Sequence, residues 1–221
     1  MTLVTLPVVR VLRVDGDQPA AVLERLEGDL PPRERTGTAT ARTARAACRQ
    51  ILGALLGEAP AAVPISRRCS HCGHESHGRP TVPAAAVAFS VSHSGTRALV
   101  AVVPAAVALG VDIELVRPRT RLEALARRAL GPDELAAWEA SDDRLRTFLH
   151  AWTAKEAYLK ATGVGVTTAL RAVPIRPPGW TADALAVGPD AIAAIAVAAP
   201  GARVALEDWE PRVSASGGTA G

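Results

Sequence analysis

The sequence shows one pattern twice, namely a long helical segment accompanied by short apolar runs. Residues 34–56 predict the first helix, because apolar side chains recur there at spacings of three and four and Gly57 follows as a stop signal. Residues 143–162 predict a second long helix, which ends at Gly163. Two such units favour an α+β fold of two similar halves related by pseudo-twofold symmetry. The apolar set of the first helix is Ala44, Ala47, Cys48, Ile51, Leu52 and Leu55.

Short apolar or alternating runs predict the strands around these helices. The segment 93–96 has the composition of a hairpin turn, and two shorter helices are expected at 122–130 and 132–139. The predicted strands are 2–14, 87–92, 97–103, 108–114, 172–175, 185–187 and 191–197. We therefore expect an N-terminal half over 1–108, a C-terminal half over 109–213 and a flexible tail over 214–221.

Composition excludes several classes of protein. Hydrophobic residues make up 48% of the chain but aromatic residues only 3%, so the core must consist mainly of Val, Leu, Ile and Ala. The apolar opening segment contains Pro7, Arg10 and Arg13 and lacks a small-residue cleavage site, which argues against a signal peptide. No run reaches the roughly 18 uncharged apolar residues of a membrane span. These features predict a cytoplasmic protein without a membrane partner.

Charge is distributed unevenly between the halves. Residues 1–108 carry 12 arginines and 8 acids, whereas residues 109–221 carry 13 basic and 14 acidic residues. This surplus fits a first half that binds an anion and a second half that supplies acidic ligands. A module that binds nucleic acid would need a concentrated basic face and stacking aromatic side chains, which this composition does not provide.

Lysine is confined to one short segment. The chain has 25 basic residues, and the only lysines among them are Lys155 and Lys160. Lysine is a compact point charge that changes protonation when buried, and arginine does neither job well. We therefore expect the segment 152–160 to carry chemistry.

The run Gly110-Val111-Asp112-Ile113-Glu114 places two carboxylates on one face of a predicted strand. Neighbouring carboxylates repel each other unless a cation joins them, and hard oxygen ligands suit Mg²⁺. Taken alone, the five residues are equally consistent with an exposed strand edge that carries two solvated acids.

The second candidate is the helix over 148–160. Trp152, Glu156 and Lys160 are spaced four residues apart and lie along one stripe, with Lys155 beside it. A Glu–Lys pair at this spacing is also an ordinary helix stabiliser. In the functional interpretation, Glu156 adds a third carboxylate to a metal site and an ammonium neutralises phosphate oxygens.

Further candidate anion ligands precede both runs. His93 lies between Ser92 and Ser94 at the predicted hairpin, where hydroxyl and ring donors could bind a phosphate or simply stabilise the turn. In His77-Gly78-Arg79-Pro80, a loop holds an arginine suited to pairing with a phosphate.

A Cys/His-rich loop occupies residues 69–77. Cys69 and Cys72 have the spacing of zinc ligands, with His71, His74 and His77 nearby. The loop is short and has no second Cys pair, so we favour an ordered loop over a structural zinc site.

The order of these motifs, HGRP, SVSHSG, GVDIE and then WTAKEAYLK, resembles the Sfp-type 4′-phosphopantetheinyl transferases over about residues 33–170. The resemblance implies a fold of two similar α+β halves with coenzyme A bound between them. It also implies a monomer, in contrast to the half-length trimeric type of this activity.

The resemblance also implies roles for particular residues. Asp112, Glu114 and Glu156 match the family's acidic ligands of Mg²⁺, with Mn²⁺ as an alternative ion, and Asp112, Glu156 and Lys160 are the expected catalytic residues. The expected contacts with coenzyme A are Arg33, Arg45, Arg79, Ser92, His93, Lys155 and Lys160.

The activity implied is that of a holo-acyl-carrier-protein synthase, which transfers 4′-phosphopantetheine from coenzyme A to a serine of an apo acyl or peptidyl carrier protein and releases 3′,5′-ADP. Carriers of polyketide and non-ribosomal peptide synthesis are the expected partners. The alternative is another Mg²⁺-dependent nucleotide-binding transferase, although the Gly-rich phosphate loop of the commonest such enzymes is not found. Either Glu156 or a metal-bound water could accept the proton of the carrier serine.

Overall fold

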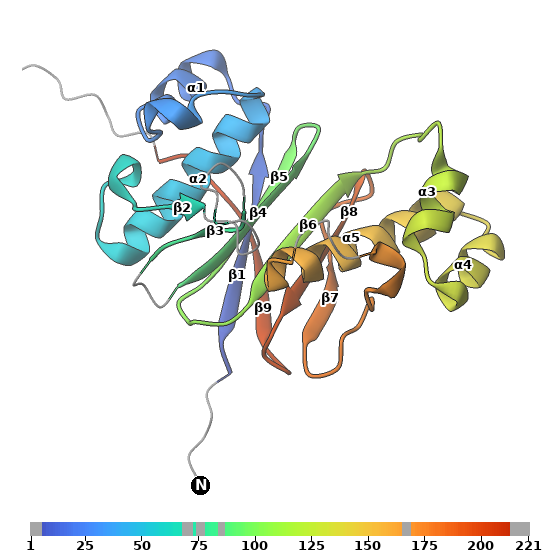
Figure 1. Ribbon diagram of the computed structural model, residues 1–221. Helices are drawn as coiled ribbons and strands as arrows, with labels where there is room; N and C mark the ends of the chain where they lie inside the picture. The colour runs from blue at the N-terminus through green and yellow to red at the C-terminus, as the bar shows by residue number, and fades with distance from the viewer. Residues whose placement is uncertain (1–5, 68–72, 74–77, 84–86, 165–168, 213–221) are drawn as a thin grey trace, which may run out of the picture.

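The computed structural model describes residues 6–67, 73, 78–83, 87–164 and 169–212. Figure 1 shows two sheets side by side, each with a long helix packed against it. The first half contains β1 (Val8–Asp15), α1 (Ala20–Glu27), α2 (Ala39–Leu56), β2 (Ser66–Arg67), β3 (Pro80–Thr81), β4 (Ala88–Ser94) and β5 (Arg97–Val103). The second half contains β6 (Leu109–Leu115), α3 (Leu122–Ala129), α4 (Pro132–Glu139), α5 (Arg144–Thr162), β7 (Thr181–Leu185), β8 (Ala191–Val197) and β9 (Arg203–Asp208).

The two halves share one topology. The first sheet has the order β4-β5-β1-β9 and the second the order β6-β8-β7. In both, the first strand pairs antiparallel with the strand that closes a β-hairpin, so that β1, β5 and β4 correspond to β6, β8 and β7. Each half also places its long helix between its first strand and its hairpin. The α+β fold of two similar halves is therefore confirmed.

The strand β9 breaks this correspondence. It pairs in parallel with β1, from Val8 opposite Arg203 to Arg13 opposite Asp208, and so completes the sheet of the first half. The sequence analysis did not predict this strand. The boundary expected between residues 108 and 109 falls between β5 and β6, and the division into halves at that point stays a prediction because β9 crosses it.

Caps set the limits of the two long helices. The Thr38 side chain accepts a hydrogen bond from the Ala41 amide (3.2 Å), so α2 begins later than predicted and residues 32–34 form a short 3₁₀ turn instead. Asp143 caps α5 in the same way, and Gly163 ends it with a φ of 74°. The predicted limits of α5 are confirmed.

Two predicted strands of the second half are wrong. Residues 170–172 form a 3₁₀ turn where a strand over 172–175 was expected, and the strand that pairs with β8 is residues 181–185 rather than 185–187. The limits of β8 itself agree with the prediction.

Small aliphatic residues fill the core on both faces of the sheets. Val9, Val11 and Leu99 of the first sheet pack against Val111 and Ile195 of the second, so one face of each sheet is buried against the other sheet. The opposite faces are covered by α2 and α5. No helix in the described part of the chain is both long and apolar enough to cross a membrane.

Candidate active site at the seam between the halves

Alternate serines of β4 join the two sheets. β4 and β6 are edge strands of their sheets, and residues two apart on β4 point toward β6. The hydroxyl oxygens of Ser90, Ser92 and Ser94 accept hydrogen bonds from the backbone amides of Val111 (3.1 Å), Ile113 (3.4 Å) and Leu115 (3.2 Å). Side-chain hydroxyls therefore replace the backbone hydrogen bonds of a continuous sheet, and they set the register of β6 against β4.

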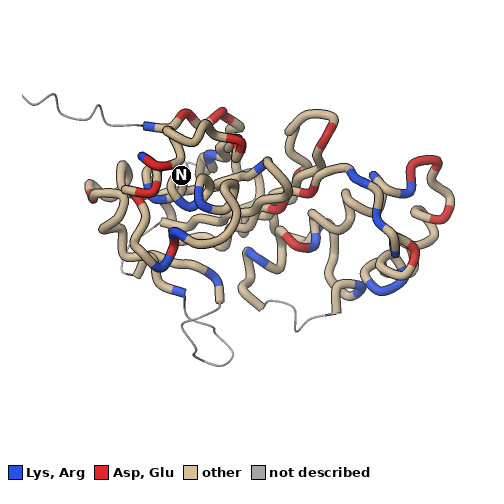
Figure 2. The backbone as a smooth tube through the Cα atoms, turned by 90° about the horizontal axis from the view of Figure 1, so that it is seen from above, with Lys and Arg blue, Asp and Glu red and all other residues tan. Residues whose placement is uncertain are grey.

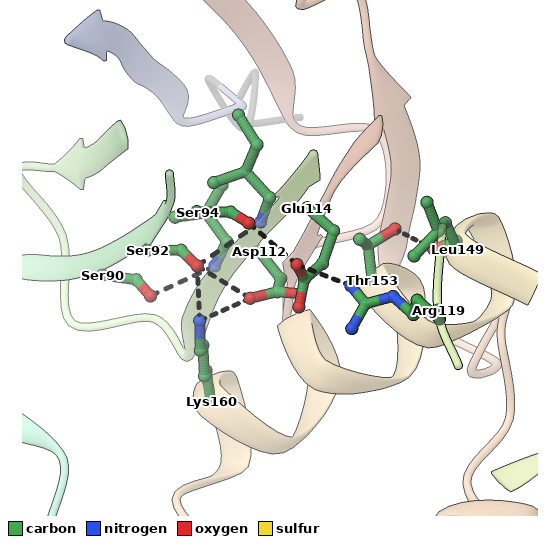
Figure 3. Close-up of polar contacts among 11 residues, drawn as sticks. Ser90, Ser92, Ser94, Asp112, Glu114, Arg119, Leu149, Thr153 and Lys160 are labelled. Atoms are coloured by element: carbon green, nitrogen blue, oxygen red, sulfur yellow. Dashed lines mark hydrogen bonds and ion pairs between the residues drawn. The ribbon is translucent and has the colours of Figure 1, made fainter. Parts of the chain in front are cut away.

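The same serines orient the two acids of β6. Ser92 Oγ donates to Asp112 Oδ1 (2.8 Å), and Ser94 Oγ donates to Glu114 Oε2 (2.9 Å). Lys160 Nζ reaches across from α5 to Asp112 Oδ1 (2.6 Å) and Ser92 Oγ (2.8 Å). Figure 3 shows the two carboxylates side by side, with Lys160 on one side and Arg119 on the other.

Gly110 explains why α5 lies so close to β6. A Cβ at this position would lie 1.9 Å from the carbonyl oxygen of Ala157 and 2.6 Å from the amide nitrogen of Ala161. The helix backbone therefore crosses the strand directly over the glycine. This crossing brings Lys160 of α5 within reach of Asp112, which is two residues further along β6.

Asp112 is buried with an unsatisfied oxygen. Burial raises the pKa of its carboxyl, and the ammonium of Lys160 and the hydrogen bond from Ser92 act in the opposite direction. Its Oδ2 has no hydrogen-bond partner among the described residues. A buried carboxylate oxygen without a partner is costly and indicates a position where a cation or a donor of a ligand would be stabilised.

Glu114 is held by a second cation. Arg119 Nη2 donates to Glu114 Oε2 (2.9 Å), and about one fifth of each of these side chains is exposed. Arg119 Nε is itself buried and has no hydrogen-bond partner in the part of the chain that the structure describes. The sequence analysis did not single out this arginine.

Glu156 lies in the electrostatic field of the other two acids. Burial raises the pKa of its carboxyl, the charges of Asp112 and Glu114 raise it further, and Lys160 opposes them. The three predicted acids therefore influence one another across the seam. A carboxyl with a raised pKa is a better proton acceptor near neutral pH than an ordinary glutamate.

The acids do not form a closed metal site in this structure. Among the described residues, no three His, Cys, Asp or Glu side chains are grouped so that they could hold an ion. The donor set still fits a hard divalent cation, because it offers carboxylate oxygens and the free Oδ2 of Asp112. Lys160 and Arg119 neutralise Asp112 and Glu114 instead.

Lys155 has contacts that the sequence did not predict. Its side chain is fully buried among protein acceptors. Its ammonium pairs with Glu134 and donates to the carbonyl oxygens of Ala129 (2.9 Å) and Leu170 (3.1 Å). All three donors are used by protein acceptors, so Lys155 joins α5 to α3 and α4, and its contact with coenzyme A stays a prediction.

Arg79 is also placed differently from the prediction. Its guanidinium donates to the carbonyl oxygens of Ala161 (2.6 Å) and Leu109 (3.3 Å), at the end of α5 and the start of β6. Burial lowers its pKa. Arg79 therefore connects a first-half loop to the second half, and because only two of its five N–H donors are used by these carbonyl oxygens, its contact with a phosphate stays a prediction.

Arg45 and His93 do lie together, in a cavity of about 300 Å³ in the first half, which Arg67 and Glu34 also line. Arg45 donates to the carbonyl oxygens of Glu34 (2.7 Å) and Thr36 (2.6 Å), which fixes its guanidinium at the cavity. Burial lowers the pKa of His93, as do the charges of Arg45 and Lys160. His93 thus lies between the basic cavity and the seam.

The other predicted ligands have distinct positions. Arg33 is exposed in the 3₁₀ turn that precedes α2, outside the residues that line the cavity. The hydroxyl proton of Ser92 is donated to Asp112, so Ser92 would have to leave that carboxylate to bind a phosphate. Cys69 and Cys72, for which an ordered loop was favoured over a zinc site, lie outside the described residues. Figure 2 shows acidic and basic positions gathered where the halves meet.

Several residues of the site were not predicted from the sequence. The spacing of Ser90, Ser92 and Ser94 by two carried a signal, because it places three hydroxyls on one side of a strand. Arg67 and Arg119 gave no such signal in a chain rich in arginine. Arg67 lines the cavity together with residues that are distant from it in the sequence, and Arg119 reaches Glu114 because of the path of the loop between β6 and α3.

Comparison with known proteins agrees with this geometry. Residues 108–200 match the family model of the 4′-phosphopantetheinyl transferase superfamily. The 4′-phosphopantetheinyl transferase HetI of Nostoc sp. is 31% identical over 233 residues, which cover 92% of this chain and 90% of that protein. A 4′-phosphopantetheinyl transferase of Bacillus subtilis is 33% identical over 107 residues, covering 47% of this chain and 46% of that protein. A putative 4′-phosphopantetheinyl transferase of Synechocystis sp. is 38% identical over 87 residues, or 38% and 35% of the two chains.

Proposed function

This chain belongs to the 4′-phosphopantetheinyl transferase superfamily and is a transferase of that kind, and we propose that it moves 4′-phosphopantetheine from coenzyme A to a serine of an apo carrier protein with Mg²⁺. The observation that carries the proposal is the contact of Lys160 with Asp112 at the seam, close to a cavity lined by arginines and a histidine. Basic side chains in this arrangement can bind the anionic phosphates of the substrate. They can also stabilise the negative charge that develops on the leaving phosphate.

The nucleotide end of coenzyme A is proposed to bind at the cavity of the first half. Arg45 and Arg67 present guanidinium groups that suit phosphate oxygens, and His93 adds a ring donor. The volume of about 300 Å³ is at the lower end of the range for small-ligand sites, which suits one end of a long substrate whose remainder lies outside. Arg33, which is exposed nearby in sequence, stays a proposed contact for the same end.

The pyrophosphate is proposed to lie between His93 and Lys160. The two groups interact electrostatically, because the charge of Lys160 contributes to the lowered pKa of His93. Two of the three ammonium protons of Lys160 go to Ser92 and Asp112 among the described residues, which leaves one for a phosphate oxygen. Lys160 would therefore offset the charge that develops on the departing phosphate.

Asp112, Glu114 and Glu156 are proposed to hold the Mg²⁺, whose charge would offset that of the pyrophosphate. The support is the unpaired Oδ2 of Asp112 and the mutual influence of the acids on the pKa of Glu156. Ser92 and Ser94 would keep Asp112 and Glu114 oriented toward the substrate.

In the chemical step, the serine oxygen of the carrier forms a bond to the β-phosphorus of coenzyme A while the bond from that phosphorus to the bridging oxygen breaks. The products are the phosphopantetheinyl serine and 3′,5′-ADP. The serine proton passes to Glu156, directly or through a water that Glu156 contacts, because an ionised carboxylate can act as a general base.

The wider setting follows from the same proposal. Both halves of the site come from one chain, with β4 from the first half and β6 and α5 from the second, so we propose that a monomer is active. Carriers of polyketide or non-ribosomal peptide synthesis in the cytoplasm are the proposed partners, on the strength of the Sfp-type motifs. Another Mg²⁺-dependent nucleotide transferase is the second candidate, favoured only by the carboxylate–lysine cluster.

Intact-mass spectrometry tests the proposal. An apo carrier protein incubated with coenzyme A, Mg²⁺ and the enzyme should gain the mass of one phosphopantetheine, and the carrier with its serine changed to alanine should not. The Asp112→Ala variant should lose most of this activity, and a chelator should abolish it. Absence of mass gain on any acyl or peptidyl carrier would refute the transfer, and full activity of Asp112→Ala at low Mg²⁺ would refute the metal assignment.

A further inference from the structure

The carboxylate of Glu114 is already paired with Arg119, which would compete with any metal ion that binds there. Arg119 Nη2 donates to Glu114 Oε2 at 2.9 Å, the oxygen that also accepts the hydrogen bond of Ser94. The guanidinium of Arg119 and a divalent cation would therefore compete for the carboxylate of Glu114, because two positive groups at one oxygen repel each other. We propose that Arg119 is the counterion of Glu114 in the metal-free protein and that a divalent cation displaces it.

Charge balance supports the exchange. The three acids carry three negative charges, and Lys160 and Arg119 contribute two positive ones, so the metal-free cluster has a net charge of about −1 when all groups are ionised. A divalent cation in place of Arg119 makes the cluster neutral. A divalent cation added beside Arg119 would leave the buried site with an excess positive charge before any substrate arrives.

Arg119 is also held in a way that permits its release. Its Nε is buried and finds no acceptor among the residues that the structure describes, so its hydrogen bonding at Glu114 is incomplete. It lies between β6 and α3, in a segment that is neither helix nor strand, whereas Lys160 is fixed on α5. Movement of the Arg119 side chain therefore breaks one ion pair and no element of secondary structure.

This inference rests on the proposed metal role of Glu114 and predicts that Arg119 weakens cation binding. Mn²⁺ is the probe, titrated into the purified chain without coenzyme A and followed by calorimetry and by the electron paramagnetic resonance signal of free Mn²⁺. Arg119→Gln should bind Mn²⁺ about fivefold to tenfold more tightly than the wild type, as loss of a partly buried competing ion pair requires. Arg119→Lys, which keeps the charge without the planar guanidinium, should fall between them.

Arg117→Gln is the matched control, because it removes the same charge from an exposed position two residues away. It should change Mn²⁺ affinity by less than about twofold, since exposed charges are screened. Thermal unfolding of each variant shows whether the fold is kept, and Arg119→Lys serves if Arg119→Gln does not fold.

Equal affinities of Arg119→Gln and Arg117→Gln, or weaker binding by Arg119→Gln, would overturn the inference and make Arg119 an organiser of Glu114 instead. Absence of Mn²⁺ binding by every folded variant would overturn it as well. The proposed transferase function is judged separately by the mass gain of the carrier, so its failure is distinguishable from failure of the exchange.

Discussion

Replacing Gly110 by alanine should push α5 away from β6, because the new methyl carbon would lie 1.9 Å from the carbonyl oxygen of Ala157. An ordinary carbon–oxygen contact is about 3.3 Å, so the helix would have to move by about 1.4 Å. The obstacle is helix backbone and cannot rotate away. We therefore expect a destabilisation of about 3 kcal/mol, at the upper end of overpacking costs.

The same shift should slow the reaction as well as destabilise the fold. For a chain of this size, about 3 kcal/mol corresponds to a fall in Tm of about 6–12 °C, which differential scanning calorimetry resolves. A displacement of about 1 Å of Lys160 from Asp112 should lower kcat by about 100-fold in the folded protein.

Gly28→Ala provides the control for this change. Gly28 has a right-handed φ of −62°, and an added Cβ would lie 3.2 Å from the carbonyl oxygen of Arg25, so alanine there requires a far smaller displacement than at Gly110. If Gly110→Ala and Gly28→Ala had the same Tm and the same kcat, the close crossing of α5 over β6 would be refuted, and with it our account of how Lys160 is positioned.

Three further changes test other parts of the structure. Lys155→Met should lower the unfolding free energy by about 3 kcal/mol, because the partly buried Glu134 loses its cation, while KM for coenzyme A stays unchanged. A selective rise in KM would indicate a phosphate role for this lysine. Glu34→Gln should cost about 3 kcal/mol at pH 7, because it leaves the buried Arg49 without its charge partner. Burial acts to raise the pKa of Glu34, but Arg49 and neighbouring arginines lower it overall, so this stabilisation is present above the usual glutamate pKa and is lost as the pH falls through the lowered one. Urea unfolding of wild type and Glu34→Gln at pH 7 and in acid checks this, and a difference that did not shrink in acid would contradict it. Arg67→Ala should raise KM for coenzyme A about tenfold with little change in kcat, and high salt should reduce this difference between the variant and the wild type. Steady-state kinetics that show an unaltered KM would exclude Arg67 from the nucleotide site.

Periodicity was sufficient to predict the elements that pack on their own hydrophobic faces. The limits of α5 and β8 follow from local signals, namely the cap at Asp143, the stop at Gly163 and an uninterrupted apolar run over 191–197. The strand β9 carried only a weak pattern, RVALED, and forms because β1 offers it a free edge. A strand that depends on a partner about 195 residues away cannot be recognised from its own residues.

The site was predicted in part for a related reason. The spacing of Asp112 and Glu114 on a strand, and of Glu156 and Lys160 on a helix, identified groups that do influence one another in the structure. The buried contacts of Lys155 were not predicted, because helical spacing defines a stripe but not which side of the helix is buried. Its three acceptors come from α3, α4 and residue 170, and no local pattern shows that these segments converge.

The pairing of β9 with β1 also has a consequence for biosynthesis. The ribosome synthesises β1 first and β9 nearly 200 residues later, so the first sheet stays incomplete during most of translation. The unpaired backbone N–H and C=O groups at the edge of β1 are exposed over that time and can pair with strands of other chains. Such long-range pairing slows folding as well. We therefore expect the nascent chain to depend on chaperones until its final strand emerges, and fragments that end before residue 203 to aggregate.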